Sequence, residues 1–264
     1  MIVKHEHTFA ICAYKESVFL EECILSLKRQ TIESEIILVT STPCTFIFDL
    51  CSKYDIKYYI NEGDAGITQD WNFAYAKSST PIVTITHQDD IYFQNYTEKL
   101  LDIYKKSKKP LIFFSDYYEI RDKKIIKENR LLKIKRFMLL PMRIQAFQSN
   151  IFVRRRILSI GSPICCPSVA FFKKNLPEVI FNNHFRTNED WEAWEMISKM
   201  KGQFLYVKTP LMAHRIHEDS ETSAVIQATG RTEEDMQMYR KFWPECIAKI
   251  LCKLYKKSEE SNKI

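Results

Sequence analysis

The chain has 264 residues, a formal net charge of +6 and 45% apolar residues, so it is long enough to bury the core of one α/β domain. Only 5 residues are glycine and 9 are proline, and the sequence contains no repeat or low-complexity segment, which excludes a long flexible linker and a repeat array. No apolar run approaches the roughly 20 residues that a membrane-spanning helix needs.

In the first half of the chain, short apolar runs alternate with segments of helical spacing. This alternation predicts a mainly parallel sheet that is covered by helices on both faces. Ligands of such sheets bind beyond the carboxyl ends of the strands, where 12–16, 40–43 and 87–90 lie in this sequence. We expect strands at 8–13, 35–39, 57–60, 81–86 and 111–115, and helices at 16–29, 45–53 and 67–76, the last with Thr68 as a possible cap.

The second half is less regular. We expect short strands at 168–172 and 204–208 and a helix at 190–200 with Trp191 and Trp194 on one face. A long helical region should run from 232 to 255, broken near Pro244.

Between these halves, residues 121–156 hold twelve Lys and Arg against two acids, so this segment carries +10 and the remainder of the chain −4. Leucine, isoleucine and phenylalanine interleave with the basic residues. A solvated amphipathic helix explains this pattern, and so does a surface for anionic lipid or a lipid-phosphate acceptor. Nucleic acid is a weaker alternative, because no recognition motif accompanies the charge.

Eight cysteines are scattered along the chain, and none forms a CxxC pair. The segment from Met1 to His7 is polar and charged, so no signal peptide is expected. We therefore expect most of the cysteines to be reduced, buried side chains of a cytosolic protein. Their spacings do not match those of cysteine zinc sites.

Asp89 and Asp90 follow the expected strand at 81–86, after His87 and Gln88. Two adjacent carboxylates repel each other, and a divalent cation that bridges them to a diphosphate would remove that cost. A turn or a helix cap is the alternative explanation, since aspartate is common in both.

Two further polar segments stand out. Asn188-Glu189-Asp190 precedes the tryptophan-rich helix, where the acids either favour a helix N-terminus or include a general base for a hydroxyl. The segment 214–220, HRIHEDS, contains two histidines and an arginine, which suit a transition metal and a phosphate, respectively. A plain polar loop is the alternative for this segment.

Taken in order, these segments resemble family 2 glycosyltransferases, which have the GT-A fold. FAICAYKESVFLEECILSLKRQT resembles the opening strand, nucleotide loop and first helix of that family, and GITQDWNFAYAKSSTPIVTITHQDDIY resembles its helix, strand and DxD-type metal motif. NEDW matches the acidic motif of the catalytic base, and HRIHEDSETS resembles the late R-x-H-x-x-S loop that closes over diphosphate and metal. The resemblance covers roughly Phe9 to Ser223.

The resemblance implies a role for each matching residue. It makes Asp190 the catalytic base, with Glu189 as its neighbour, and Asp89 the metal ligand, supported by Asp90. It further implies that Arg215 and His217 contact diphosphate or metal on a mobile loop. The remaining residues on the donor side are Tyr14, Glu16, Thr40 and Asn72.

Three positions depart from the family pattern. His87 stands where the metal motif has its first aspartate, and Cys12 and Lys15 replace the usual Pro and Asn of the opening loop. The second strand ends in VTST instead of the acids that hold the base or ribose, which puts a uridine donor in doubt, although Thr40 or Ser41 could hydrogen-bond there.

We therefore expect a GT-A-like domain at 1–225, with the helical basic insert at 121–156 and a C-terminal helical extension at 226–264. The resemblance implies hexosyl-type transfer from a nucleoside-diphosphate sugar, with inversion and with Mn²⁺ or Mg²⁺. The expected acceptor is a glycan or lipid-linked glycan of a bacterial surface polysaccharide, such as lipopolysaccharide or capsule. The expected location is the cytoplasm, peripheral on the inner face of the membrane.

Two other functions fit parts of the sequence. A nucleotidyltransferase would use a similar sheet but normally needs a glycine-rich phosphate loop, and ICAYKES contains no glycine. A non-catalytic protein could bind anionic lipid or nucleic acid through the basic insert.

Overall fold

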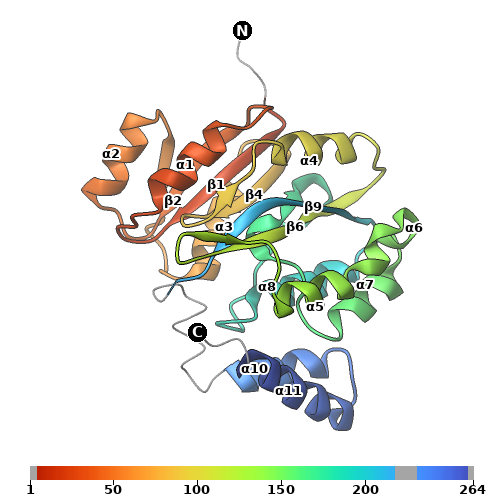
Figure 1. Cartoon of the computed structure of the whole chain (residues 1–264). Helices are drawn as coiled ribbons and strands as arrows, with labels where there is room; N and C mark the ends of the chain where they lie inside the picture. Colours follow the sequence, from red (N-terminus) through yellow and green to blue (C-terminus); the bar gives the residue numbers. More distant parts are fainter. Residues whose placement is uncertain (1–4, 218–230, 261–264) are drawn as a thin grey trace.

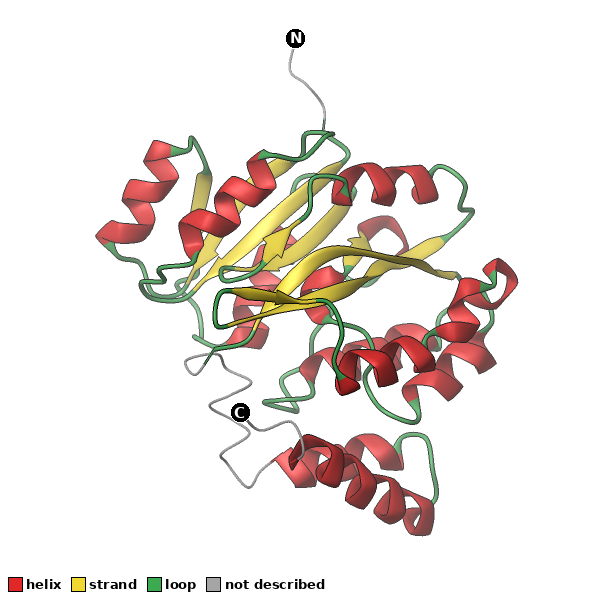
Figure 2. Ribbon diagram, viewed as in Figure 1, coloured by secondary structure: helices red, strands yellow, loops and turns green. Residues whose placement is uncertain are grey.

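The structure is a computed structural model that describes residues 5–217 and 231–260. A nine-stranded sheet crosses the molecule and has helices on both of its faces (Figures 1 and 2). The strand order is β3-β2-β1-β4-β8-β6-β9-β5, with β7 paired to β6. Strand β8 is antiparallel to both of its neighbours, whereas β3, β2, β1 and β4 are mutually parallel, and so are β6 and β9. The predicted mainly parallel α/β architecture is thereby confirmed.

The first half follows the predicted alternation of strands and helices closely. Helix α1 begins later than predicted, at Leu20, so the residues after Ala13 form a longer loop at the strand end. Gly66 precedes α3, so Thr68 lies inside that helix and is not its cap. The elements are β1 (His7–Ala13), α1 (Leu20–Lys28), β2 (Glu35–Thr40), α2 (Thr45–Lys53), β3 (Lys57–Ile60), α3 (Ile67–Lys77) and β4 (Ile82–His87).

The second half departs more from the prediction. Strand β9 continues to Arg215, so His214 and Arg215 belong to a strand and not to a loop. The break near Pro244 is confirmed. The elements are β5 (Ile91–Tyr92), α4 (Tyr96–Tyr104), β6 (Pro110–Arg121), β7 (Lys124–Ile126), α5 (Arg130–Met138), η1 (Leu140–Arg143), α6 (Gln145–Gln148), α7 (Ile151–Leu158), η2 (Cys166–Ser168), β8 (Ala170–Phe172), η3 (Lys173–Asn175), α8 (Glu189–Ser198), β9 (Gln203–Arg215), α10 (Arg231–Arg240) and α11 (Glu245–Glu260).

Two apolar clusters cover the two faces of the sheet. On β1, Phe9 and Ile11 pack against α1, α2 and α4, whereas Ala10 faces the cluster that contains α3, α7 and α8. Because both faces of β1 are buried, its sequence reads as a continuous apolar run without polar alternation. Trp191 and Trp194 are both fully buried in the cluster that contains α3, α7 and α8.

The basic insert is only partly a surface element. Arg154 is buried and donates hydrogen bonds to the backbone carbonyls of Ser198, Met200 and Gly202, after the end of α8. Arg155 pairs with Glu195 at 2.7 Å. The expectation that this segment lies outside the core is wrong for these residues, because they anchor α7 to α8. The basic side chains of the insert that remain exposed are Lys123, Lys124, Lys127, Arg130, Lys133 and Arg143.

The C-terminal helices pack on the domain. Tyr239 of α10 and Cys252 of α11 are buried in the same cluster as Trp191, and the rings of Trp191 and Tyr239 meet edge-to-face with centroids 5.2 Å apart. The predicted extension therefore contributes to the core where it is described. All eight cysteines are free thiols. Among the described helices, none combines the length and apolar character needed to span a membrane.

Candidate active site

The carboxyl ends of β1, β2 and β4 meet at one edge of the sheet, because these parallel strands are neighbours. The loop that follows β1 is fixed there by two side chains. Gln88 accepts a hydrogen bond from the backbone nitrogen of Tyr14 at 3.1 Å and donates one to its carbonyl at 3.0 Å. Lys15, with a φ of 55°, donates its backbone N–H to the hydroxyl of Thr42 at 2.6 Å. The side chains of Tyr14 and Glu16 are thus left exposed beside the strand ends.

Asp89 lies at this edge together with the end of β9. Its Oδ2 lies 2.8 Å from Nε2 of His217, and both side chains remain partly exposed. Arg215 donates from Nε to the Asp89 carbonyl at 2.8 Å and from Nη2 to Glu22 of α1 at 2.7 Å, while its guanidinium stacks over Phe19. Arg215 is nearly buried, and these contacts position Asp89.

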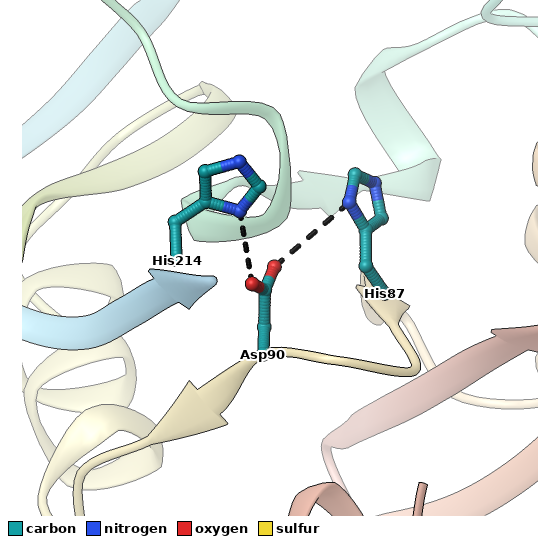
Figure 3. Close-up of side chains that lie close together, drawn as sticks. All are labelled: His87, Asp90 and His214. Carbon is teal, nitrogen blue, oxygen red and sulfur yellow. Dashed lines mark hydrogen bonds and ion pairs between the residues drawn. The ribbon is translucent and has the colours of Figure 1, made fainter. Parts of the chain in front are cut away.

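Asp90 points the other way, into the protein. It is fully buried, and its Oδ1 accepts a hydrogen bond from the backbone nitrogen of Arg215 and lies 2.9 Å from Nδ1 of His214. Its Oδ2 lies 3.8 Å from Nδ1 of His87. Figure 3 marks the contacts of Asp90 with both histidines by dashed lines. The ring of His87 stacks on Trp71, with centroids 5.3 Å apart. Asp90 therefore joins the ends of β4 and β9.

The electrostatics of these groups differ. Burial raises the pKa of the Asp89 carboxyl, but the hydrogen bond with His217 and the nearby imidazoles outweigh burial, so the pKa lies below its ordinary value. Burial lowers the pKa of His87. For His214, burial is outweighed by the charge and hydrogen bond of Asp90, which raise its pKa. At neutral pH the site therefore holds an ionised Asp89 beside a neutral His87.

A second polar group lies where β2 and β3 end. Asp70 of α3 is nearly buried and accepts hydrogen bonds from Ser41 at 2.7 Å and from the Asn61 side chain at 2.8 Å. Thr40, in contrast, is fully buried, and its hydroxyl accepts from the backbone nitrogen of Thr42. The predicted donor contact by Thr40 stays a prediction, and in the ligand-free structure this side chain shapes the loop from inside. Ser41 and Asp70 present the polar groups at this edge.

The side chain of Asn72 bonds to the backbone of the segment before α8. Its amide nitrogen donates to the carbonyl of Phe181 at 2.7 Å, and its Oδ1 accepts from the backbone nitrogens of Ile180 and Phe181, both at 3.1 Å. The predicted donor-binding role of Asn72 stays a prediction. Its amide ties the segment before α8 to α3.

The two acids at the start of α8 differ in burial. Glu189 is buried, with only 5% of its surface exposed, whereas Asp190 is partly exposed. Oδ1 of Asp190 accepts a hydrogen bond from the backbone nitrogen of Trp191 at 2.6 Å, so the carboxylate also stabilises the first turn of the helix. Both readings of this segment, helix N-terminus and accessible acid, therefore apply to Asp190.

Three residues of the site were not predicted from the sequence. Gln88 sits between two motif positions, Glu22 lies on the exposed face of α1, and Asp70 falls inside α3. Asp70 is the one with a usable signal, because an acid buried within an amphipathic helix needs polar partners. The partners of the other two depend on long-range packing.

The sheet is mainly parallel, paired acids follow β4, and a polar cluster lies beyond the end of β2. This arrangement is that of a GT-A-type glycosyltransferase. The chain belongs to glycosyl transferase family 2, whose model matches residues 8–181. It is similar to S. aureus TarS 1–349 in complex with UDP-GlcNAc, with 13% identity, a TM-score of 0.62, and coverage of 94% of this chain and 70% of that one. The UDP complex of the same TarS fragment gives 12% identity, a TM-score of 0.58 and coverage of 94% and 69%.

Against the longer S. aureus TarS structure, identity is 11% and the TM-score 0.58, and the match covers 93% of this chain but only 42% of that one. The chain thus spans less than half the length of that protein. Comparison with curated protein sequences gave no match. At these identities the structural neighbours establish the GT-A fold, and the family model establishes the enzyme class.

Proposed function

We propose that this glycosyltransferase moves a hexosyl group from a nucleoside-diphosphate sugar to an acceptor hydroxyl, with inversion at the anomeric carbon. The observation that carries the proposal is the pair of Asp89 and His217, 2.8 Å apart and partly exposed at the joined ends of β4 and β9. This edge also receives the loop after β1, so donor phosphates and a nucleoside would share one crevice.

The residues at this edge fit a divalent cation. Asp89 offers a carboxylate and His217 an imidazole, a ligand set that suits Mn²⁺ better than Mg²⁺ because imidazole is a ligand of transition metals. A bound cation would stabilise the negative charge on the leaving diphosphate. Arg215 fixes the backbone of Asp89, so that the carboxylate is aimed before any ligand binds.

The donor nucleoside is proposed to lie against Tyr14, Glu16 and the group formed by Ser41, Asn61 and Asp70. The carboxylate of Asp70 would do what the missing strand-end acids do in related enzymes, namely accept a hydrogen bond from a base or ribose. The TarS structures solved with UDP-GlcNAc and UDP make a uridine nucleotide the first donor to test.

Asp190 is proposed to remove the acceptor proton. As the proton passes to its carboxylate, the acceptor oxygen bonds to the anomeric carbon and the bond from that carbon to the diphosphate oxygen breaks. The nucleoside diphosphate leaves with the bonding electrons. Glu189 is too buried to reach an acceptor and would serve the helix N-terminus.

The proposed setting is assembly of a bacterial cell-surface polysaccharide from a glycan or lipid-linked glycan acceptor. The exposed basic residues of the insert would bring the enzyme to the anionic inner face of the cell membrane as a peripheral protein of the cytoplasm. Nucleic acid is not a proposed partner.

The test is release of nucleoside diphosphate from a panel of nucleotide sugars with Mn²⁺, with and without candidate acceptors. Glycosyl transfer predicts acceptor-dependent release of diphosphate from one donor. A nucleotidyltransferase would instead form or release pyrophosphate, and a non-catalytic binding protein would consume no donor. Either of the last two results would overturn the proposal.

A further inference from the structure

Three potential metal ligands lie close together next to Asp89. Nδ1 or Nε2 of His87 and of His214 and a carboxylate oxygen of Asp90 all lie within 4.8 Å of one another. They come from the end of β4, from the turn before β5 and from the end of β9, and they face one another in Figure 3. No role in donor binding or in proton transfer has been assigned to either histidine.

The cluster is incompletely satisfied by hydrogen bonds. Within the described residues, Oδ2 of the fully buried Asp90 has no hydrogen-bond partner, and neither does the buried Nε2 of His87. The gap of 3.8 Å between Oδ2 of Asp90 and Nδ1 of His87 is too long for a hydrogen bond. A buried carboxylate oxygen without a partner is costly, so this gap indicates a position for a positive ligand.

Aromatic side chains lie next to both imidazole rings of the cluster. His87 stacks on Trp71 with an interplanar angle of 12°, and the ring centroid of His214 lies 6.5 Å from that of Tyr117. The carboxylate of Asp90 is fixed by the backbone nitrogen of Arg215. Both imidazoles keep about a fifth of their side-chain surface exposed, so an ion has a path from solvent.

We propose that His87, Asp90 and His214 form a binding site for Zn²⁺ or a similar transition-metal dication, separate from the cation that accompanies the donor at Asp89 and His217. Two imidazoles and one carboxylate are a ligand set that favours zinc over Mg²⁺ and leaves a fourth position for water. The ion would replace the proton now shared by Nδ1 of His214 and Asp90, and sub-ångström shifts would close the remaining gap. The cysteine spacings that argued against zinc do not bear on this site, which contains no cysteine.

Such an ion would link parts of the sheet that are not neighbours. Strands β4 and β9 are separated by β8 and β6, and His87 and His214 stand at their ends. Binding to the folded protein alone should therefore raise Tm, and it should do so without any nucleotide. For this reason the proposal can be tested independently of glycosyl transfer.

The test uses the full chain without nucleotide. Zn²⁺ affinity is measured by competition with a chromophoric chelator, and the site is probed with Co²⁺ by visible absorption. We expect Zn²⁺ to bind the cluster in the wild type and in His184→Gln, and also in Asp89→Asn, which alters only the separate cation site. Affinity should fall about tenfold or more in His87→Gln and in His214→Gln. His184 is a matched control because it is an exposed histidine outside the cluster.

X-ray absorption of the wild-type Zn²⁺ complex gives a readout that needs no variant, should either histidine substitution impair folding. Two imidazoles and oxygen around the ion would support the site. Unchanged affinity in both histidine variants would overturn it, as would sulfur in the coordination shell, because the eight free cysteines are the competing ligands. Loss of nucleotide-free binding in Asp89→Asn alone would place the ion at the donor site and would also overturn the proposal.

Discussion

Nε2 of His217 lies 2.8 Å from Oδ2 of Asp89, although 128 positions separate the two residues in sequence. The contact connects a histidine two residues after the end of β9 with an acid two residues after the end of β4. It depends on Arg215, which is the last residue of β9 and bonds to the Asp89 carbonyl. The expected mobile loop therefore begins later than the sequence suggests. Its remaining part, 218–223, lies outside the described residues.

Replacing Asp89 by Asn should reduce transfer by roughly 10²-fold or more, because the leaving diphosphate loses its cation ligand. Manganese-dependent nucleotide binding, followed by calorimetry, should be lost, while Tm without ligand changes little. Asp102→Asn, which removes an exposed carboxylate on α4, is the control and should behave like wild type. Full activity of the Asp89 variant in the presence of chelator would contradict the assignment.

Replacing Asn72 by Ala should destabilise the protein by about 1–3 kcal/mol, because three hydrogen bonds to Ile180 and Phe181 are lost and buried backbone groups stay unpaired. Urea unfolding measures the change. The KM for the donor should change little, and the exposed Asn183→Ala should leave stability unaltered. A large rise in donor KM at unchanged stability would return Asn72 to the donor site.

The parallel half of the sheet could be predicted from sequence because its signals are local. Strand β1 is a continuous apolar run, and Asp89 comes two residues after the end of β4. The ligand edge then follows from the rule that parallel strands end together. By contrast, β9 was predicted as five residues but has thirteen, since its second half is stabilised by pairing with Tyr117–Ile120 of β6. Such long-range pairing leaves no periodic signal.

The direction in which side chains point was the other feature that could not be predicted from the sequence. Asn72 and Thr40 were placed on the correct elements, at the correct edge, yet both point into the protein. Likewise, the basic insert was recognised by its charge, but sequence could not separate Arg154, which is buried under backbone carbonyls, from the exposed Arg143. Composition reports the charge of a segment, whereas packing decides which charges face water.

The exposed part of the insert leads to a prediction for membranes. Phe137 and Phe152 are 72% and 70% exposed, near basic residues that face solvent. Binding to vesicles that contain an anionic lipid should weaken as salt rises, because surface charges are screened. Phe137→Ser should weaken it further by removing apolar area. Equal sedimentation with neutral and anionic vesicles would remove the electrostatic explanation.

The burial of His7 leads us to expect that the stability of the protein depends on pH. This buried imidazole contacts the hydroxyls of Ser34 and Thr84, and burial lowers its pKa from 6.5 to about 3. Between these values the unfolded chain binds a proton that the folded chain does not, so stability falls as pH drops below about 6.5, by up to about 1.4 kcal/mol per pH unit. In urea unfolding between pH 7 and pH 5, His7→Gln should show a smaller slope, and the exposed His184→Gln should keep the wild-type slope. An unchanged slope in His7→Gln would mean that the imidazole is protonated in the folded state.

Asp190 carries the proposed proton transfer, and its difference in exposure from Glu189 allows a sharp comparison. Asp190→Asn keeps the shape and can still accept the hydrogen bond from the Trp191 backbone, so donor binding and Tm should stay near wild type. Transfer should fall by roughly 10²–10⁴-fold, because the acceptor hydroxyl loses its base. Glu189→Gln alters a buried carboxylate, so it should lower Tm more than it lowers kcat. Single-turnover transfer and thermal unfolding, measured on both variants, separate the two roles. Near-normal transfer by Asp190→Asn together with a large loss in Glu189→Gln at unchanged Tm would move the base to Glu189, and near-normal transfer by both would exclude carboxylate catalysis at this helix.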